Sequence, residues 1–170
     1  MTAAEPLTVR PDLFRSVLGR IPTGVMVITT STPTGQQART ANSFVSVSLR
    51  PPLVSVCFSD KSPFTAALRA SGLWGVSVLA AEQHELSVHF AHRQSPKDLT
   101  GIPHTIGSLT GAALLTECVA TMECRSVLTQ PAGDHTLLIG EVLTLLPRRD
   151  STPLLFYRGG YHQVGSTVRT

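Results

Sequence analysis

The sequence predicts a mainly β protein, a single β-barrel domain with a few short helices. Its 170 residues are 42% hydrophobic and 15% charged, which suits one globular domain and excludes a disordered chain. Short runs of β-branched residues recur between prolines and glycines, and helical periodicity is confined to short segments. We expect residues 1–170 to form one domain with a core of about 12–164, and the apolar excess to be covered by a second subunit or a ligand.

The individual elements follow from local patterns along the chain. Residues 11–21 carry apolar side chains at helical spacing, and Pro11 suits a first helical turn. Ser62 and Pro63 have the character of an N-cap and first residue of a second helix. We expect helices at 11–21, 63–70 and 81–93, strands at 24–30, 38–49, 53–58, 74–79, 117–130, 135–146 and 154–157, and a long surface loop with partial structure at 94–116.

Cysteine usage and charge narrow the cellular setting and the class of partner. The three cysteines form no CxxC pair, so we expect neither disulfides nor a zinc ribbon, and a reducing cytoplasm is the simplest location. The first residues carry no basic segment followed by an apolar stretch, and no apolar run of membrane-spanning length occurs, so we expect neither a cleaved signal peptide nor a membrane span. The net charge of +3 is scattered, which favours no nucleic-acid partner and no membrane attachment.

Common catalytic motifs are absent from the sequence. Neither a GxGxxG fingerprint, a Walker A loop nor a GxSxG elbow occurs. His84 and His89 are five residues apart, whereas HExxH requires four. His89 and His92 lie three apart without a third ligand nearby, so surface histidines are the simpler interpretation and we expect no metal site.

The stretch 38–49 is the most informative candidate site. Strict alternation places Thr40, Asn42, Phe44, Ser46 and Ser48 on one face of a strand. Three hydroxyls, a carboxamide and an aromatic ring suit a groove for a planar, phosphorylated ligand. The same alternation also fits a half-exposed strand with a hydrated outer face.

Two glycine-containing segments share this ambiguity. Residues 133–135 (Gly-Asp-His) read first as a hairpin turn followed by the start of a strand. Residues 159–162 (Gly-Gly-Tyr-His) likewise read as a turn near the C-terminus.

Taken together, these segments resemble the flavin reductase family, the small reductase components of two-component flavin monooxygenases. The resemblance covers about residues 13–164 and is most specific in the blocks TANSF-x-SVS and GDHTLLIGEV. The other matching segments are Phe14-Arg15, Pro22–Val25, Val27–Thr29, Pro52–Val54, Trp74–Leu79, Phe90-Ala91, Pro153–Tyr157 and Tyr161-His162.

This resemblance implies a split β-barrel, usually a homodimer, that binds FMN or FAD and reduces it with NADH or NADPH. It implies that reduced flavin diffuses to a partner monooxygenase. By position, the isoalloxazine and ribityl side of the flavin would be lined by Thr40, Ala41, Asn42, Ser43 and Phe44, and the contact would continue along the flavin through Ser46, Val47 and Ser48. The flavin tail would be contacted by Cys57, Lys61 and Ser62, and its phosphate would lie near Phe90 and Ala91. The nicotinamide would lie beside His135 and Tyr161.

The implied mechanism passes a hydride from the nicotinamide to the flavin, so the protein positions the rings and no side-chain base is required. Backbone N–H groups of residues 41–43 would stabilise charge on the flavin, and His135 would act by positioning. Residues 92–99 depart from the acidic-Lys-Phe sequence that relatives often have, and Cys57 replaces a serine of some relatives. Two alternatives stay open: an oxidase or oxygenase that retains its flavin, and a non-enzymatic flavin-binding dimeric barrel.

Overall fold

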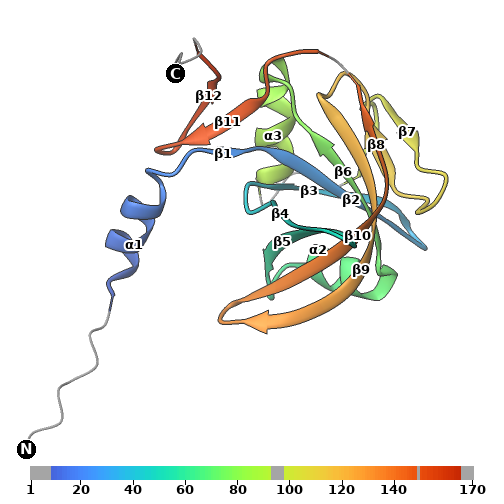
Figure 1. Cartoon of the computed structure of the whole chain (residues 1–170), viewed down its shortest axis with the longest axis horizontal. Helices are drawn as coiled ribbons and strands as arrows, with labels where there is room; N and C mark the ends of the chain where they lie inside the picture. The colour runs from blue at the N-terminus through green and yellow to red at the C-terminus, as the bar shows by residue number, and fades with distance from the viewer. Residues whose placement is uncertain (1–8, 93–97, 149, 166–170) are drawn as a thin grey trace, which may run out of the picture.

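The computed structural model describes residues 9–92, 98–148 and 150–165 (Figure 1). Its helices are few and short, and most of its elements are strands, so the predicted mainly β class is confirmed. The helices are α1 (Pro11–Leu18), α2 (Pro63–Ser71) and α3 (His84–Ala91), with a 3-10 turn η1 (Ala81–Gln83). The strands are β1 (Thr23–Gly24), β2 (Met26–Thr32), β3 (Gly35–Ala41), β4 (Val45–Leu49), β5 (Pro52–Ser59), β6 (Leu73–Val78), β7 (His104–Ile106), β8 (Ala113–Leu115), β9 (Ala120–Ala132), β10 (His135–Pro147), β11 (Leu154–Tyr157) and β12 (Gly160–Gln163).

A seven-stranded antiparallel sheet, in the order β3-β2-β6-β9-β10-β5-β4, forms the body of the molecule. Its two edge strands, β3 and β4, are joined by only three residues, 42–44. Such a short link cannot cross an open sheet of this width, because each residue spans at most about 3.6 Å. The sheet therefore curves until its edges meet, and residues 42–44, between β3 and β4 in Figure 1, form the seam of the resulting barrel.

The predicted continuous strand 38–49 is wrong at this seam. Residues 42–44 leave the strand geometry, β3 pairs with β2, and β4 pairs with β5. Phe44 accordingly packs against the core, whereas Ser46 is exposed. Because the chain passes from one edge of the sheet to the other between β3 and β4, the alternation of side chains in β3 does not continue into β4. The predicted face shared by the side chains of residues 40–48 therefore does not exist.

Two hydrophobic cores share the central strand β2. Ile28 belongs to the first core with Trp74 and Leu138, whereas Val27 belongs to the second with Phe90. Alternate side chains of a strand point to opposite faces, so β2 is the wall between the two cores. Helix α2 contributes Phe64 and Leu68 to the first core, and α3 contributes Phe90 to the second.

The segment 94–116 has the predicted partial structure, but its predicted surface position is wrong for residues 112–115. Strands β7 and β8 pair with each other, and residues 112–115 are buried. The buried Glu123 carboxylate holds the preceding turn by accepting hydrogen bonds from the N–H groups of Leu109 and Thr110 and from the Thr110 hydroxyl, at 2.7–2.9 Å. The sequence of residues 109–110 shows no clear periodicity, and the Glu123 side chain of β9 fixes the conformation of this turn.

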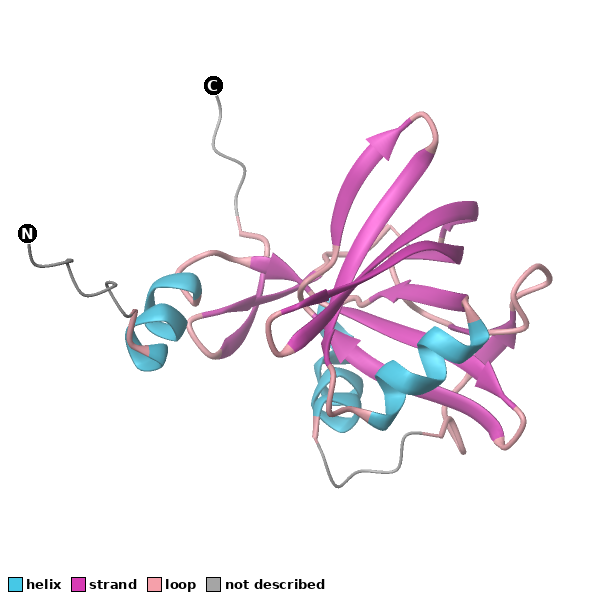
Figure 2. Ribbon diagram, turned by 90° about the horizontal axis from the view of Figure 1, so that it is seen from below, coloured by secondary structure: helices cyan, strands magenta, loops and turns pink. Residues whose placement is uncertain are grey.

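A second, three-stranded sheet of β1, β11 and β12 connects the barrel to helix α1. Helix α1 extends away from the barrel in both views and has no buried residue (Figures 1 and 2). Its apolar face, Leu13, Phe14, Val17 and Leu18, is half exposed. Among the described residues, no helix combines the length and apolar character needed to cross a membrane.

Candidate functional site

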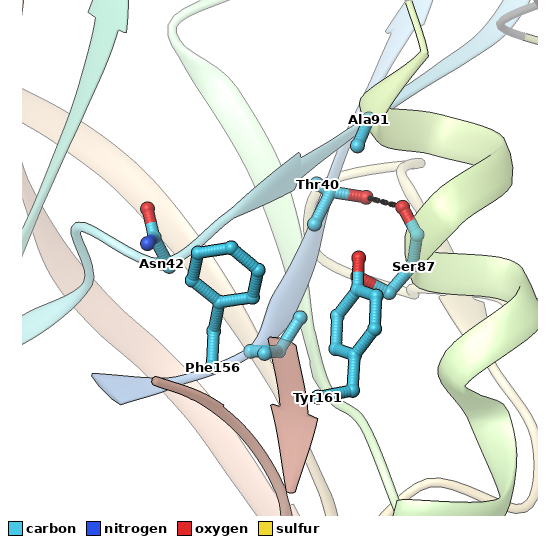
Figure 3. A pocket seen from close by; sticks show the side chains of 7 residues that line it. Thr40, Asn42, Ser87, Ala91, Phe156 and Tyr161 are labelled. Carbon is cyan, nitrogen blue, oxygen red and sulfur yellow. Dashed lines mark hydrogen bonds between the residues drawn. The ribbon is translucent and has the colours of Figure 1, made fainter. Parts of the chain in front are cut away.

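A pocket opens where the barrel seam, α3 and the small sheet meet (Figure 3). The end of β3 supplies Thr40, and Asn42 of the seam follows it. Helix α3 supplies Ser87 and Ala91 from successive turns. The pocket has a volume of about 230 Å³, and its remaining lining residues are Val25, Phe156 and Tyr161.

Hydrogen bonds fix the polar wall of this pocket. The Thr40 hydroxyl donates to the backbone carbonyl of Ser87 at 2.7 Å, as the dashed line in Figure 3 shows. The Ser87 hydroxyl lies 2.8 Å from the hydroxyl of Tyr161. The rings of Tyr161 and Phe156 meet edge to face, with centroids 5.5 Å apart. Strand β3, helix α3 and the β11–β12 hairpin are therefore locked together around one cavity.

The lining fits a flat heteroaromatic ring. Two aromatic side chains supply apolar contact, while Thr40 and Asn42 supply polar groups, which is the usual mixture of a small-molecule site. A neighbouring hollow of about 240 Å³ under α1 shares Asn42 and Phe156 with the pocket. Together the two reach the size typical of cofactor sites.

A second, more polar pocket lies beside the start of α2. It has a volume of about 260 Å³ and is lined by Arg39, Ser59, Lys61, Ser62 and Pro63. Two cationic side chains and two hydroxyls suit an anion such as phosphate. Arg39 and Thr40 are neighbours in β3, and their side chains point to opposite faces, so this pocket and the first flank the same edge strand.

The seam itself is held by a link between Ser43 and Cys57, which were each predicted separately as flavin contacts. The Ser43 hydroxyl donates to the Cys57 carbonyl and accepts from the Cys57 N–H, both at 3.0 Å. This link joins the seam to β5 beyond Ser55, the last residue of β5 that pairs with β4. Burial raises the pKa of the Cys57 thiol, so it stays neutral near physiological pH.

Several predicted site residues point into the cores or along the outer edge. Ala41 and Phe44 belong to or pack against the first core, and Phe90 is fully buried in the second, directly behind Ala91. On the edge strand β4, Ser46 and Val47 are exposed and Ser48 is half-buried. Residues 93–97, where the sequence departs from the family pattern, lie outside the described residues.

Tyr161 lines the first pocket, whereas His135 does not. His135 begins β10 at the tip of the long β9–β10 hairpin, where it pairs with Ser59 of β5. This tip lies apart from β12, which carries Tyr161, in both views (Figures 1 and 2). The imidazole Nδ1 lies 2.7 Å from a carboxylate oxygen of Asp134, and this hydrogen bond lowers the pKa of that carboxyl.

Sequence reasoning missed six residues that line the two pockets: Val25, Ser87 and Phe156 in the first, and Arg39, Ser59 and Pro63 in the second. Ser87 lies on the buried face of α3, three residues before Phe90, and a hydroxyl among apolar helix positions was its signal. Phe156 lies in a segment that matched the family but received no role. Val25 has the sequence character of a core residue only, and Arg39 directly precedes the TANSF block at residues 40–44 without belonging to it.

Comparisons with known proteins agree with this geometry. A family model described as "Flavin reductase like domain" matches residues 18–165. The chain is 39% identical to the reductase subunit HsaB of a flavin-dependent monooxygenase from Rhodococcus jostii, over 94% of this chain and 80% of HsaB. It is 38% identical to the NADH-dependent FMN reductase AsuE2 of Streptomyces nodosus subsp. asukaensis, over 87% and 82% of the two chains. It is also 38% identical to an NADH-dependent FAD reductase of Streptomyces globisporus, over 88% and 84%.

A solved structure shows the same architecture. BorF, the flavin reductase component of a bacterial two-component tryptophan halogenase, superposes with a TM-score of 0.87 at 33% sequence identity. The match covers 93% of this chain and all of the BorF chain. The chain belongs to the flavin reductase-like domain family.

Proposed function

We propose that this protein is an NAD(P)H-dependent flavin reductase that reduces FMN or FAD and supplies reduced flavin to a partner monooxygenase. The observation that carries the proposal is the pocket of Thr40, Asn42, Ser87 and Tyr161 at the barrel seam, built from segments that the family model covers. The relatives' names support it, because they include NADH-dependent reductases of both FMN and FAD and a monooxygenase reductase subunit.

In this proposal the flavin and the nicotinamide supply the redox chemistry, and the chain binds and orients them. Phe156 and Tyr161 offer ring surface against which a flat group packs. Backbone N–H groups of residues 41–43 offer hydrogen bonds to negative charge that develops on the flavin. Lys61 and Ser62, together with Arg39, offer an anion site for the flavin tail across the edge of β3.

The remaining predicted residues take indirect roles. Ala41, Ser43, Phe44 and Cys57 shape the seam through core packing and hydrogen bonds. Phe90 supports Ala91 from behind. Ser46, Val47 and Ser48 are the exception: we propose them as direct flavin contacts, because β4 begins directly after the seam.

We further propose a homodimer in the cytoplasm. Apolar side chains of α1 and of the edge strand β4, among them Leu49 at 89% exposure, have no cover within one protomer. A second copy covers such surfaces and brings a His135 tip to a site that its own chain does not reach. The expected species in sedimentation has twice the chain mass of 18.1 kDa, and a monomer at micromolar concentration contradicts the proposal. The three free thiols suit a reducing compartment.

The test of the function is nicotinamide oxidation followed by absorbance, with purified protein, NADH or NADPH, and free FMN or FAD. Flavin-dependent oxidation is expected with at least one pair. If no combination of nicotinamide and flavin gives oxidation of the nicotinamide, the proposed reductase activity is overturned. A tightly held flavin that turns over without added flavin assigns the protein to the oxidase class instead.

His135→Ala tests the positioning role in the same assay. Because the imidazole offers one oriented contact, its loss is expected to raise KM for the nicotinamide by roughly tenfold and to leave flavin affinity within about twofold. His135→Gln, which keeps a hydrogen-bonding side chain, is expected to recover part of the loss. A drop in flavin affinity alone places His135 with Lys61 and Ser62 at the flavin tail and contradicts the nicotinamide role.

A further inference from the structure

A strongly cationic hollow lies between α1 and the turn of the β11–β12 hairpin. It has a volume of about 360 Å³, and three arginines line it: Arg15, Arg20 and Arg158. Ser16, Gly19 and Gly159 complete the lining, so small residues leave the space between the guanidinium groups open. No acidic side chain lines this hollow.

The hairpin turn holds one of these arginines in a costly conformation. Tyr157 pairs with Gly160, so Arg158 and Gly159 form a two-residue loop, and both have positive φ values, 50° and 80°. Such turns favour asparagine or glycine at both positions, because a long side chain is strained there. An arginine at this position indicates that its side chain is needed where the turn places it.

The surrounding contacts hold the hollow in place. The Arg158 N–H donates to the Gly19 carbonyl at 2.8 Å, which ties the end of α1 to the hairpin. The Arg158 guanidinium lies over the Tyr157 ring, 5.3 Å from its centroid. This contact orients the charge and leaves its N–H groups available to a ligand.

The charges of the hollow are only weakly compensated in the described part of the chain. None of the three arginines forms an ion pair there. Asp12 is paired with Arg10, and it also attracts Arg15 over a longer distance. Three like charges around one hollow repel one another, and an anion in the hollow removes that cost.

The hollow is linked to the proposed flavin site by shared walls. Arg15 and Gly19 line both the cationic hollow and the apolar hollow under α1. The apolar hollow in turn shares Asn42 and Phe156 with the pocket of Thr40 and Tyr161. A ligand with an aromatic group at the pocket and phosphates farther along thus meets a continuous path.

We propose that Arg15, Arg20 and Arg158 bind the phosphate groups of a dinucleotide whose reactive ring occupies the Thr40–Tyr161 pocket. Guanidinium groups match phosphate oxygens with paired hydrogen bonds. The inference rests on the proposed reductase function and adds to it a phosphate site separate from Arg39 and Lys61. The phosphates belong either to the nicotinamide donor or to FAD, and both present the same chemistry. Because the two phosphates of FAD are directly linked, FAD would place its whole diphosphate in this hollow instead of at Arg39 and Lys61.

The test uses Arg15→Gln, Arg20→Gln and Arg158→Asn, since asparagine tolerates the positive φ of the turn. Arg69→Gln, an exposed arginine in the last turn of α2, is the matched control. Three quantities are measured: KM for NADH with FMN as acceptor, affinity for FMN and for FAD, and ADP-ribose binding by calorimetry, which requires no turnover.

Each hollow variant is expected to weaken ADP-ribose binding by roughly tenfold relative to the control. A matching rise in KM for NADH, with FMN affinity unchanged, assigns the phosphates to the nicotinamide donor. A loss of FAD affinity with FMN affinity unchanged assigns them to FAD. Binding constants that all equal those of Arg69→Gln overturn the proposal. ADP-ribose binding that depends on the arginines in a protein without reductase activity overturns only the proposed function.

Discussion

Gly140→Ala is expected to lower the free energy of unfolding by about 3 kcal/mol, near the upper end for an overpacked core. A Cβ at residue 140 would lie 2.3 Å from Cζ2 of Trp74. Trp74 is fully buried, and its indole N–H donates to the Ser126 hydroxyl at 3.1 Å, so the ring cannot withdraw without losing packing and this hydrogen bond. Urea denaturation measures the change, and the melting temperature is expected to fall by roughly 6–12 °C.

Two further variants separate this clash from a general effect of alanine. Gly165→Ala is the matched control, because a Cβ there meets nothing within 4 Å and φ lies outside the left-handed region. Trp74→Phe removes the ring atoms that clash, so the double variant with Gly140→Ala should be less destabilised than the two single changes together. Strict additivity would show that the two residues do not oppose each other.

Ala91→Trp is expected to reduce kcat/KM by at least about 100-fold, because the indole fills the pocket in which we place the reacting rings. Ala91 lies at the end of α3 and lines the cavity of about 230 Å³ beside Thr40 and Tyr161. An exposed residue at a pocket wall can be enlarged without disturbing a core. The measurement is steady-state oxidation of NADH in the presence of free flavin.

Val88→Trp provides the control for the added indole. Val88 is an exposed residue of the same helix, 49% accessible, and does not line the pocket. Its variant should retain turnover within about twofold, and both variants should unfold at similar urea concentrations. Full activity of a folded Ala91→Trp protein would show that the reaction does not take place in this pocket.

Periodicity in the sequence predicted most strands because burial imposes alternation within any one strand. β10 falls close to its expected range, and burial alternates along its first half. β6 also falls close to its expected range, although its four middle residues are all buried. The family motif also indicated Thr40 and Asn42, which the structure places in one pocket with Ala91 and Tyr161.

The seam could not be predicted from the pattern, because alternation continues through residues 42–44 although the strand does not. The break comes from closure of the sheet, which depends on contacts between Ser43 and Cys57, fourteen residues apart. Glu123 and the turn before β8 pose the same problem, since a carboxylate in an alternating strand reads as solvent-exposed. Arg158 is more than a hundred residues from Arg15 and Arg20 in the sequence, and the three gather only when α1 meets the hairpin.

The chain contains a single tryptophan, and its position gives the protein an intrinsic optical reporter. Trp74 lies in the first core, on the other side of β2 from the core that includes Tyr161 and Phe156. Its emission reports solvent entry into the first core, because the emission wavelength of a buried indole shifts when water reaches the ring. A bound flavin absorbs where tryptophan emits, so occupancy quenches this emission by energy transfer without touching the ring. Unfolding shifts the emission wavelength, whereas flavin binding lowers the emission intensity. One unlabelled sample therefore distinguishes the two events.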